Sequence, residues 1–227
     1  MPAPLSVIIP ALDEAGALPT CLSSLMPGLE TGLLREVILV DGGSRDATRS
    51  IAEAAGCRIF ESDPGRAPQL RCGAREARGR WLLFLHADTA LGPNWTERAA
   101  AHMEGSQDIA AAFTLAYRSD APEAQWLAAR ANRRARWFGL PYGDQGLLIS
   151  RSFYEAVGGY PDLKLMEDVA IVRAIGKKRM RILSAEARTC AAKYERDGWR
   201  RRSYRNAWLL VRYALGAPPE RLARHYT

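Results

Sequence analysis

Long hydrophobic runs, paired cysteines and internal repeats are all missing from this 227-residue sequence. No apolar run reaches the roughly 18 residues that a helix needs to cross a bilayer, so no transmembrane segment is expected. The N-terminus lacks a basic segment followed by an apolar one, so no signal peptide is expected. The four cysteines are scattered and form no C-x-x-C pair. Their spacing predicts reduced thiols and a cytoplasmic location.

The composition is typical of a soluble globular protein, with 48% apolar and 25% charged residues. The length fits one α/β domain with a full core. The formal net charge is +7, and arginines gather in segments 130–136 and 196–205. This uneven distribution indicates an anionic partner near the C-terminal half, or else a solvated basic face.

Short β-rich runs alternate with segments of helical spacing in the first half of the chain. The pattern predicts strands at 5–10, 36–40, 58–61 and 81–85, and helices at 17–29, 46–55 and 67–77. Such alternation indicates βαβ units and a largely parallel sheet. Ligands bind such sheets beyond the carboxyl ends of the strands. The polar residues just past these ends are Asp13, Glu14, Asp41, Ser44, His86 and Asp88.

The second half is less regular. Its pattern predicts strands at 109–117, 145–149 and 181–183, and helices at 122–137, 151–157 and 167–175. No low-complexity linker separates these segments. The simplest organisation is therefore one domain over residues 1–192, followed by a basic, amphipathic, helical C-terminal extension over residues 193–227.

Three short constellations carry chemistry, and each has a structural alternative. Asp41-Gly42-Gly43-Ser44 lies at a strand-to-helix junction, where the backbone can approach a phosphate, or where a turn simply caps a helix. His86-Ala87-Asp88 follows an apolar strand, so Asp88 is either a ligand for Mg²⁺ or Mn²⁺ or a surface aspartate. Glu167-Asp168 opens a helix, as a general base or as capping acids.

Taken together, these features resemble the inverting glycosyltransferase family 2, whose members have the GT-A fold. The matching segments, in order, are 7–14, 37–48, 84–89, 143–146 and 166–168. The sequence is most similar to a bacterial subgroup, "transferase 2, rSAM/selenodomain-associated", through residues 65–67, 86–88 and 142–146. The resemblance implies an α/β, Rossmann-like nucleotide-binding domain with a mostly parallel central sheet and helices on both faces.

The resemblance also implies residue roles. The nucleotide-sugar site would comprise Pro10, Ala11, Leu12, Glu14, Asp41, Gly42, Ser44, Arg66, Gln69, His86, Ala87 and Gln145. Asp41 corresponds to the carboxylate that pairs with the base, typically uracil N3, so a UDP-sugar is the expected donor. Asp88 corresponds to the family's ligand for Mn²⁺ or Mg²⁺. Asp168 corresponds to the catalytic base that deprotonates an acceptor hydroxyl, with Glu167 beside it.

The sequence departs from the family at two points. His86 stands where the family usually has the first acid of its D-x-D motif, and it would contact the ribose or a phosphate, or pack. The Gln-x-x-Arg-Trp motif of processive synthases is absent, which argues against polymer synthesis. Two other functions stay open: a nucleotidyltransferase, and a catalytically degenerate protein that binds an anionic ligand.

A predicted helix over 200–215 places Tyr204, Ala207, Trp208, Val211 and Leu215 on one face. Arginines surround this face, and segment 126–137 has a similar mixture of arginine and tryptophan. Such a face suits peripheral contact with the inner side of a membrane and a lipid-linked acceptor. The alternative is that it packs onto the domain or onto a second subunit in a homodimer. No nucleic-acid partner is expected.

Overall fold

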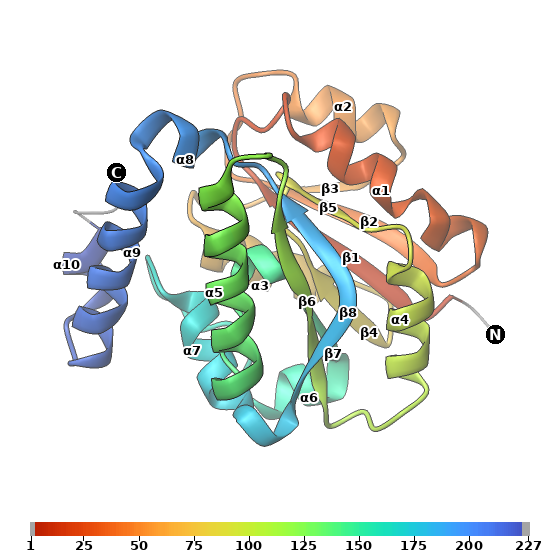
Figure 1. Ribbon diagram of the computed structural model, residues 1–227. Coiled ribbons are helices and arrows are strands. Elements are labelled where there is room, and N and C mark those ends of the chain that lie inside the picture. The colour runs from red at the N-terminus through yellow and green to blue at the C-terminus, as the bar shows by residue number, and fades with distance from the viewer. Residues whose placement is uncertain (1–2, 224–227) are drawn as a thin grey trace.

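The computed structural model describes residues 3–223, and a single eight-stranded sheet organises them (Figure 1). The strand order is β3-β2-β1-β4-β7-β6-β8-β5. The strands are β1 (Leu5–Ala11), β2 (Leu34–Asp41), β3 (Arg58–Glu61), β4 (Trp81–Phe84), β5 (Thr89–Leu91), β6 (Ala110–Tyr117), β7 (Leu147–Ser150) and β8 (Met180–Thr189). The first four strands thus form one side of the sheet and the last three form the other, where β5 pairs with β8 at the edge.

The predicted parallel βαβ arrangement is confirmed for the first four strands. β1 pairs in parallel with β2 and with β4, and β2 pairs in parallel with β3. β7 runs antiparallel to β4 and β6, whereas β6 and β8 are parallel. Because the carboxyl ends of β1, β2 and β4 share one edge, the polar residues that follow them meet there.

Helices cover both faces of the sheet, as expected. α1 (Leu18–Glu30), α2 (Thr48–Ala54) and α4 (Trp95–Met103) pack with Val7 and Ile9 in one apolar cluster. α3 (Arg66–Glu76), α6 (Arg151–Ala156) and α7 (Glu167–Ile175) pack with Ile8 in the other. Successive residues of a strand point to opposite faces, so the continuous apolar run of β1 serves both clusters.

Two elements of the second half complete the wall on the carboxyl side of the sheet. α5 (Pro122–Phe138) packs against β6 and β8, and Asn132 brackets β6 by bonding both the N–H and the C=O of Leu115 (2.8 and 2.9 Å). A short 3-10 turn, η1 (Gly143–Gln145), leads into β7.

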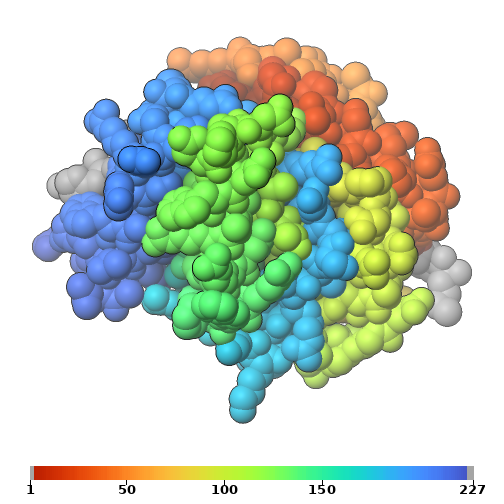
Figure 2. All heavy atoms as spheres, viewed as in Figure 1, coloured from red at the N-terminus to blue at the C-terminus, as the bar shows by residue number. Residues whose placement is uncertain are grey.

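Three helices close the described chain: α8 (Ala192–Asp197), α9 (Trp199–Ala214) and α10 (Pro219–Ala223). Leu209 and Leu222 pack on Leu165, Met166 and Val169 around the start of α7 in a third apolar cluster. Figure 2 shows this C-terminal segment, in blue, beside α5, in green, on one side of the molecule. The division at residue 193 stays a prediction, and residues 224–227 of the predicted extension lie outside the described residues.

The predicted helix over 200–215 is confirmed, but its predicted apolar face does not pack onto the domain, and packing onto a second subunit stays a prediction. Tyr204, Val211 and Leu215 are 75%, 57% and 82% exposed. The helix instead docks through Leu209, which is buried, and Arg202 is also buried and lies over the ring of Tyr194. Within residues 3–223, no helix combines the length and the apolar character that a membrane span requires.

Candidate functional site

A cavity of about 510 Å³ opens at the carboxyl edge of the sheet. Its inner wall is formed by the segment after β4 and by the starts of α3 and α7, which contribute His86, Asp88, Arg66 and Asp168. Its outer wall comes from α5, η1, α8 and α9. Cavities of a few hundred Å³ hold small-molecule ligands, so this is the candidate active site.

Asp168 lies on the inner wall with its carboxylate held by backbone amides. The N–H of Gly143 donates to Oδ2 (2.9 Å), and the N–H of Val169 donates to Oδ1 (2.8 Å). The N-terminus of α7 adds its partial positive charge. Each oxygen retains a lone pair, so the carboxylate is fixed in orientation and still able to accept a proton.

His86 packs directly against the backbone of Gly143. A Cβ atom added to Gly143 would lie 2.6 Å from His86 Nε2 and 3.4 Å from Asp168 Oδ2. Desolvation, reinforced by Arg66, lowers the pKa of His86 to about 4. At neutral pH the imidazole is therefore uncharged, and glycine at position 143 is what allows it to lie beside Asp168.

Asp88 follows β4, and its backbone carbonyl accepts from the N–H of Cys190 (3.1 Å) and from Arg118 Nη2 (2.9 Å). The side-chain hydroxyls of Thr89 and Thr189 each lie 3.3 Å from Asp88 Oδ1. These contacts fix the strand end and orient one carboxylate oxygen while Asp88 still lines the cavity.

Glu167 differs sharply from its neighbour Asp168. It is 2% exposed, does not line the cavity, and pairs with Arg66 Nη1 through Oε1 (3.2 Å). Burial raises its pKa against the opposing effect of Arg66. The geometry therefore makes Glu167 a partner that positions Arg66. The predicted catalytic role for Glu167 stays a prediction.

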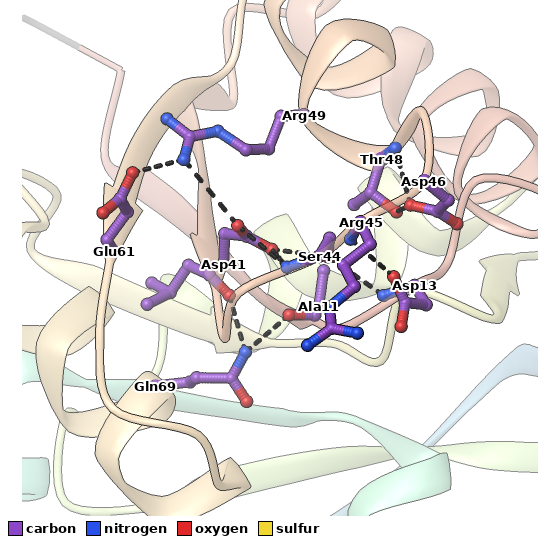
Figure 3. A network of polar contacts seen from close by, with 11 residues as sticks. Ala11, Asp13, Asp41, Ser44, Arg45, Asp46, Thr48, Arg49, Glu61 and Gln69 are labelled. Carbon is purple, nitrogen blue, oxygen red and sulfur yellow. Dashed lines mark hydrogen bonds and ion pairs between the residues drawn. The ribbon is translucent and has the colours of Figure 1, made fainter.

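The loops after β1 and β2 are tied together (Figure 3). Ser44 Oγ accepts from the N–H of Asp13 (2.9 Å), and Asp13 Oδ1 accepts from the N–H of Arg45 (2.8 Å). The N–H of Glu14 donates to Thr48 Oγ1 (2.8 Å). Asp13 has φ of 54°, a strained conformation for a residue other than glycine. The predicted nucleoside loops thus form one cross-linked unit at the carboxyl edge.

Asp41 is buried, and its carboxylate is engaged by Ser44. Ser44 Oγ donates to Asp41 Oδ1 (2.5 Å), and the N–H of Ser44 lies 3.1 and 3.2 Å from the two oxygens. Arg49 Nη1 lies 4.0 Å from Oδ2 and also pairs with Glu61 (Figure 3). A base that pairs with Asp41 would therefore have to share a carboxylate that already accepts hydrogen bonds.

Two other residues of the predicted nucleotide-sugar site form hydrogen bonds within the protein and do not line the cavity. Gln69 Nε2 donates to the carbonyls of Ala11 (2.7 Å) and Val40 (2.8 Å), which joins α3 to β1 and β2. Gln145 is buried and donates to the carbonyl of Phe113 (2.9 Å). The predicted residues outside the cavity lining are Pro10, Ala11, Leu12, Glu14, Asp41, Gly42, Ser44, Gln69, Ala87 and Gln145. Their contacts with a donor stay predictions.

Asp144 is a cavity residue that the sequence analysis did not single out. Burial and its neighbours Asp168 and Asp88 raise its pKa to about 6, against the opposing effect of Arg134. It lines the outer wall together with Lys193 and Arg134. The matched segment Gly143–Gly146 contained it, but only the fold brings it into the neighbourhood of Asp168.

The family model described as "Glycosyl transferase family 2" matches residues 6–160, which is more than half of the chain. The chain belongs to this family. Because the match ends before α7, it does not include Asp168. The narrower resemblance to the rSAM/selenodomain-associated subgroup stays a prediction.

Two curated family relatives illustrate the range of similarity. A "PGL/p-HBAD biosynthesis glycosyltransferase" of Mycobacterium bovis is 40% identical over 99 residues, covering 40% of this chain and 38% of the relative. An "Undecaprenyl-phosphate 4-deoxy-4-formamido-L-arabinose transferase" of Pseudomonas aeruginosa is 28% identical over 166 residues, covering 67% and 49%. The matched region therefore spans less than two thirds of the length of either relative.

Among solved structures, glucosyl-3-phosphoglycerate synthase from Mycobacterium tuberculosis, in complex with Mn²⁺, uridine diphosphate and glucosyl-3-phosphoglycerate, has a TM-score of 0.58. The two proteins are 20% identical, and the match covers 82% of this chain and 70% of that one. At this identity the similarity establishes a shared fold.

The donor set of this family 2 chain fits a divalent cation that is bound jointly with a phosphorylated ligand. Across the described part of the chain, no three His, Cys, Asp or Glu side chains are grouped closely enough to hold a metal ion by themselves. Asp88 offers carboxylate oxygens, and a diphosphate would supply further hard ligands. Mg²⁺ and Mn²⁺ favour oxygen ligands of this kind.

Proposed function

We propose that the protein is a metal-dependent, inverting glycosyltransferase that moves a sugar from a UDP-sugar to a hydroxyl acceptor. The observation that carries this proposal is that Asp168 and Asp88 line the same cavity together with Arg66, which pairs with Glu167 at the start of α7. Family membership supports the class of reaction. The bound UDP and Mn²⁺ of the mycobacterial synthase support the type of donor and cofactor.

Asp168 is the proposed general base. The amides of Gly143 and Val169 hold its carboxylate toward the cavity. It takes the proton of the acceptor hydroxyl while that oxygen bonds to the anomeric carbon and the bond to the nucleoside diphosphate breaks. A single displacement inverts the anomeric carbon.

Charge on the departing diphosphate needs cations in place. Arg66 on α3 and Lys193 on α8 both line the cavity, and Arg66 is oriented by the buried Glu167. Fixed cations stabilise charge that develops in the transition state without reorganisation. A divalent cation at Asp88, when bound, would supply further Lewis-acid stabilisation. Neutral His86 adds no charge but fills the position beside Asp168.

The decisive experiment is a panel of UDP-, GDP- and ADP-sugars incubated with the protein in Mn²⁺ or in EDTA, with nucleoside diphosphate release as the readout. We expect release from a UDP-sugar in Mn²⁺ only, and its loss in Asp168→Asn. Asp162→Asn is the matched control, because Asp162 is exposed and outside the cavity.

Preference for GDP- or ADP-sugars would contradict the role of Asp41 but not the fold. No release from any sugar would favour the degenerate binding protein, and nucleotide incorporation from a triphosphate would favour a nucleotidyltransferase.

The exposed arginine–tryptophan surface favours an acceptor at the cytoplasmic side of a membrane. Trp126 and Trp137 on α5 are 60% and 61% exposed and carry Arg130 and Arg133 over their rings. Trp208 on α9 carries Arg212 in the same way. Tryptophan beside arginine suits the interface of an anionic bilayer. The lipid-phosphate substrate in the name of the P. aeruginosa relative agrees with this proposal.

Vesicle flotation tests it. We expect binding to anionic vesicles that falls with salt, and its loss when Arg130, Arg133 and Arg212 become Gln. Arg202 is unsuitable for this test, because it is buried and paired with Asp197 (2.5 Å). A protein that stays off anionic vesicles at low salt contradicts the membrane proposal. If it sediments as a dimer instead, the same surface serves the predicted homodimer.

A further inference from the structure

The cavity has two kinds of lining. Its inner wall presents charged and polar groups, which include Arg66, Asp88 and Asp168. On the outer wall, α5 and α9 contribute apolar side chains together with arginines. A charged diphosphate and a hydroxylated sugar gain little from apolar surface, because burying polar groups without hydrogen bonds costs free energy. The apolar part of the lining is therefore available to the other substrate, the acceptor.

α5 lines the cavity with one of its faces. The lining residues of this helix are Leu127, Arg130, Ala131 and Arg134. Their i, i+3, i+4, i+7 spacing places all four on the same side of the helix. Leu127 is partly exposed and Arg130 is exposed, so a ligand in the cavity can reach them.

α9 lines the same cavity in the same way. Ser203, Asn206, Ala207 and Leu210 repeat the i, i+3, i+4, i+7 spacing, and Val211 lies at the edge of this face. Ala207 and Leu210 are partly exposed, and Val211 is 57% exposed. The C-terminal half of this face is therefore apolar and accessible.

Tyr142 connects these two helix faces to the proposed base. Its ring centroid lies 3.8 Å from the guanidinium of Arg134 on α5, and it packs against the same apolar cluster as Leu210 on α9. The next residue, Gly143, donates its N–H to Asp168 (2.9 Å). Figure 1 shows α5 and α9 side by side, and both line the cavity that contains Asp168. The apolar surface is thus adjacent to the reacting centre.

The outer wall is continuous with the exposed arginine–tryptophan surface. Arg130 lines the cavity and also lies over the ring of Trp126 (5.5 Å to the ring centroid), which is 60% exposed. On α9, Trp208 directly follows the cavity residue Ala207 and is 45% exposed. Tryptophan rings suit the boundary between hydrocarbon and water. A hydrocarbon chain that leaves the cavity here would meet this boundary.

We propose that the acceptor is a lipid whose hydrocarbon chain lies between α5 and α9, against Leu127, Leu210 and Val211, and whose head group presents its hydroxyl to Asp168. This proposal deepens the proposed function and rests on it. It goes beyond surface contact with a membrane, because the chain enters the cavity that contains the base.

The test is ligand-observed NMR titration in the presence of UDP and Mg²⁺, with n-octyl β-D-glucopyranoside, below its critical micelle concentration, and methyl β-D-glucopyranoside. These probes share a head group and differ only in the chain. Wild type is expected to bind octyl glucoside at least about tenfold more tightly, the effect of burying about two methylene groups. Leu127→Asn and Val211→Asn should each weaken octyl glucoside binding about threefold, which corresponds to about 25 Å² of lost apolar contact. Methyl glucoside binding should not change.

Matched controls are Phe138→Asn at the end of α5 and Leu215→Asn directly after α9. Both side chains are apolar, 60% and 82% exposed, and outside the cavity lining. Melting temperatures check folding, and Leu127→Gln or Val211→Thr replaces an asparagine variant that unfolds. Equal binding of both probes by wild type, unchanged octyl glucoside binding in both cavity variants, or an equal loss in the controls would overturn the proposal.

UDP release from a UDP-sugar, measured in parallel, separates this proposal from the proposed function. Release without a preference for octyl glucoside refutes the placement of the chain alone. A preference for octyl glucoside without release from any nucleotide-sugar refutes the proposed function.

Discussion

Asp144 also makes a prediction about stability. Burial and the like charges of Asp168 and Asp88 raise its pKa from 3.8 to about 6. A carboxyl group whose pKa is raised in the folded state favours folding when it is protonated, and that contribution is lost as the pH rises through the folded pKa. The ionised carboxylate of Asp144 therefore lowers the free energy of unfolding at neutral pH, and Asp144→Asn removes this destabilising charge.

The magnitude follows from the two pKa values. At about 1.36 kcal/mol per pKa unit, the change from 3.8 to about 6 corresponds to about 3 kcal/mol. The free energy of unfolding of Asp144→Asn should therefore exceed that of wild type by up to about 3 kcal/mol above pH 7. The difference should shrink between pH 6 and pH 4 and vanish below the unfolded pKa.

Urea unfolding at a series of pH values between 4 and 8, in EDTA, measures this difference. Asp162→Asn is the control, because its carboxylate is exposed and its replacement should give no pH-dependent change. A stability difference that is independent of pH, or a variant less stable than wild type at pH 8, would refute the assignment of Asp144 as a buried, destabilised carboxylate.

Three further predictions concern the inner wall. Asp168→Asn should lower kcat about 10²–10⁴-fold and leave UDP affinity nearly unchanged, because a base acts in the transition state. If the variant keeps most of its kcat, Asp168 is only a helix cap. Asp88→Ala should weaken UDP binding in calorimetry with Mn²⁺ but not in EDTA, whereas equal losses would mean direct contact or a structural role. Gly143→Ala should cost about 1–3 kcal/mol in urea unfolding, because its Cβ would lie 2.6 Å from His86 Nε2. His86→Ala in the same chain should recover most of that loss, and an additive double variant would contradict the contact.

The sequence predicts the first half of the fold well because its strands are strongly apolar and its helices follow at regular spacing. It fails at β8, where only residues 181–183 were expected to be a strand. The structure extends that strand from Met180 to Thr189. Ser184, Glu186 and Arg188 alternate there with small alanines, so the period of two is present but carries little hydrophobicity. β5, with three residues, and α4 were not predicted at all.

The sequence predicted the candidate site to the level of element ends, with Asp88 after a strand and Asp168 at the start of a helix. Asp88 and Asp168 were both expected to face a ligand, and both line the cavity. The family resemblance favoured Asp168 over Glu167 as the base, but the residue pattern alone could not separate them, because adjacent helical residues point about 100° apart and only packing decides which one is buried. The pKa of Asp144 depends in the same way on burial and on the charges of Arg134, Asp168 and Asp88, which no local pattern encodes.

The family match covers each wall of the cavity only in part. The family match ends at residue 160, so it contains Arg66, His86 and Asp88 but neither α7 nor α9. Leu209 and Leu222 dock the C-terminal helices on the start of α7, which couples the position of Asp168 to the wall that carries Asn206. Packing at the start of α7 thus also positions α9, which lines the cavity. Substitutions that loosen Leu209 should therefore impair transfer and acceptor binding together while leaving UDP affinity intact.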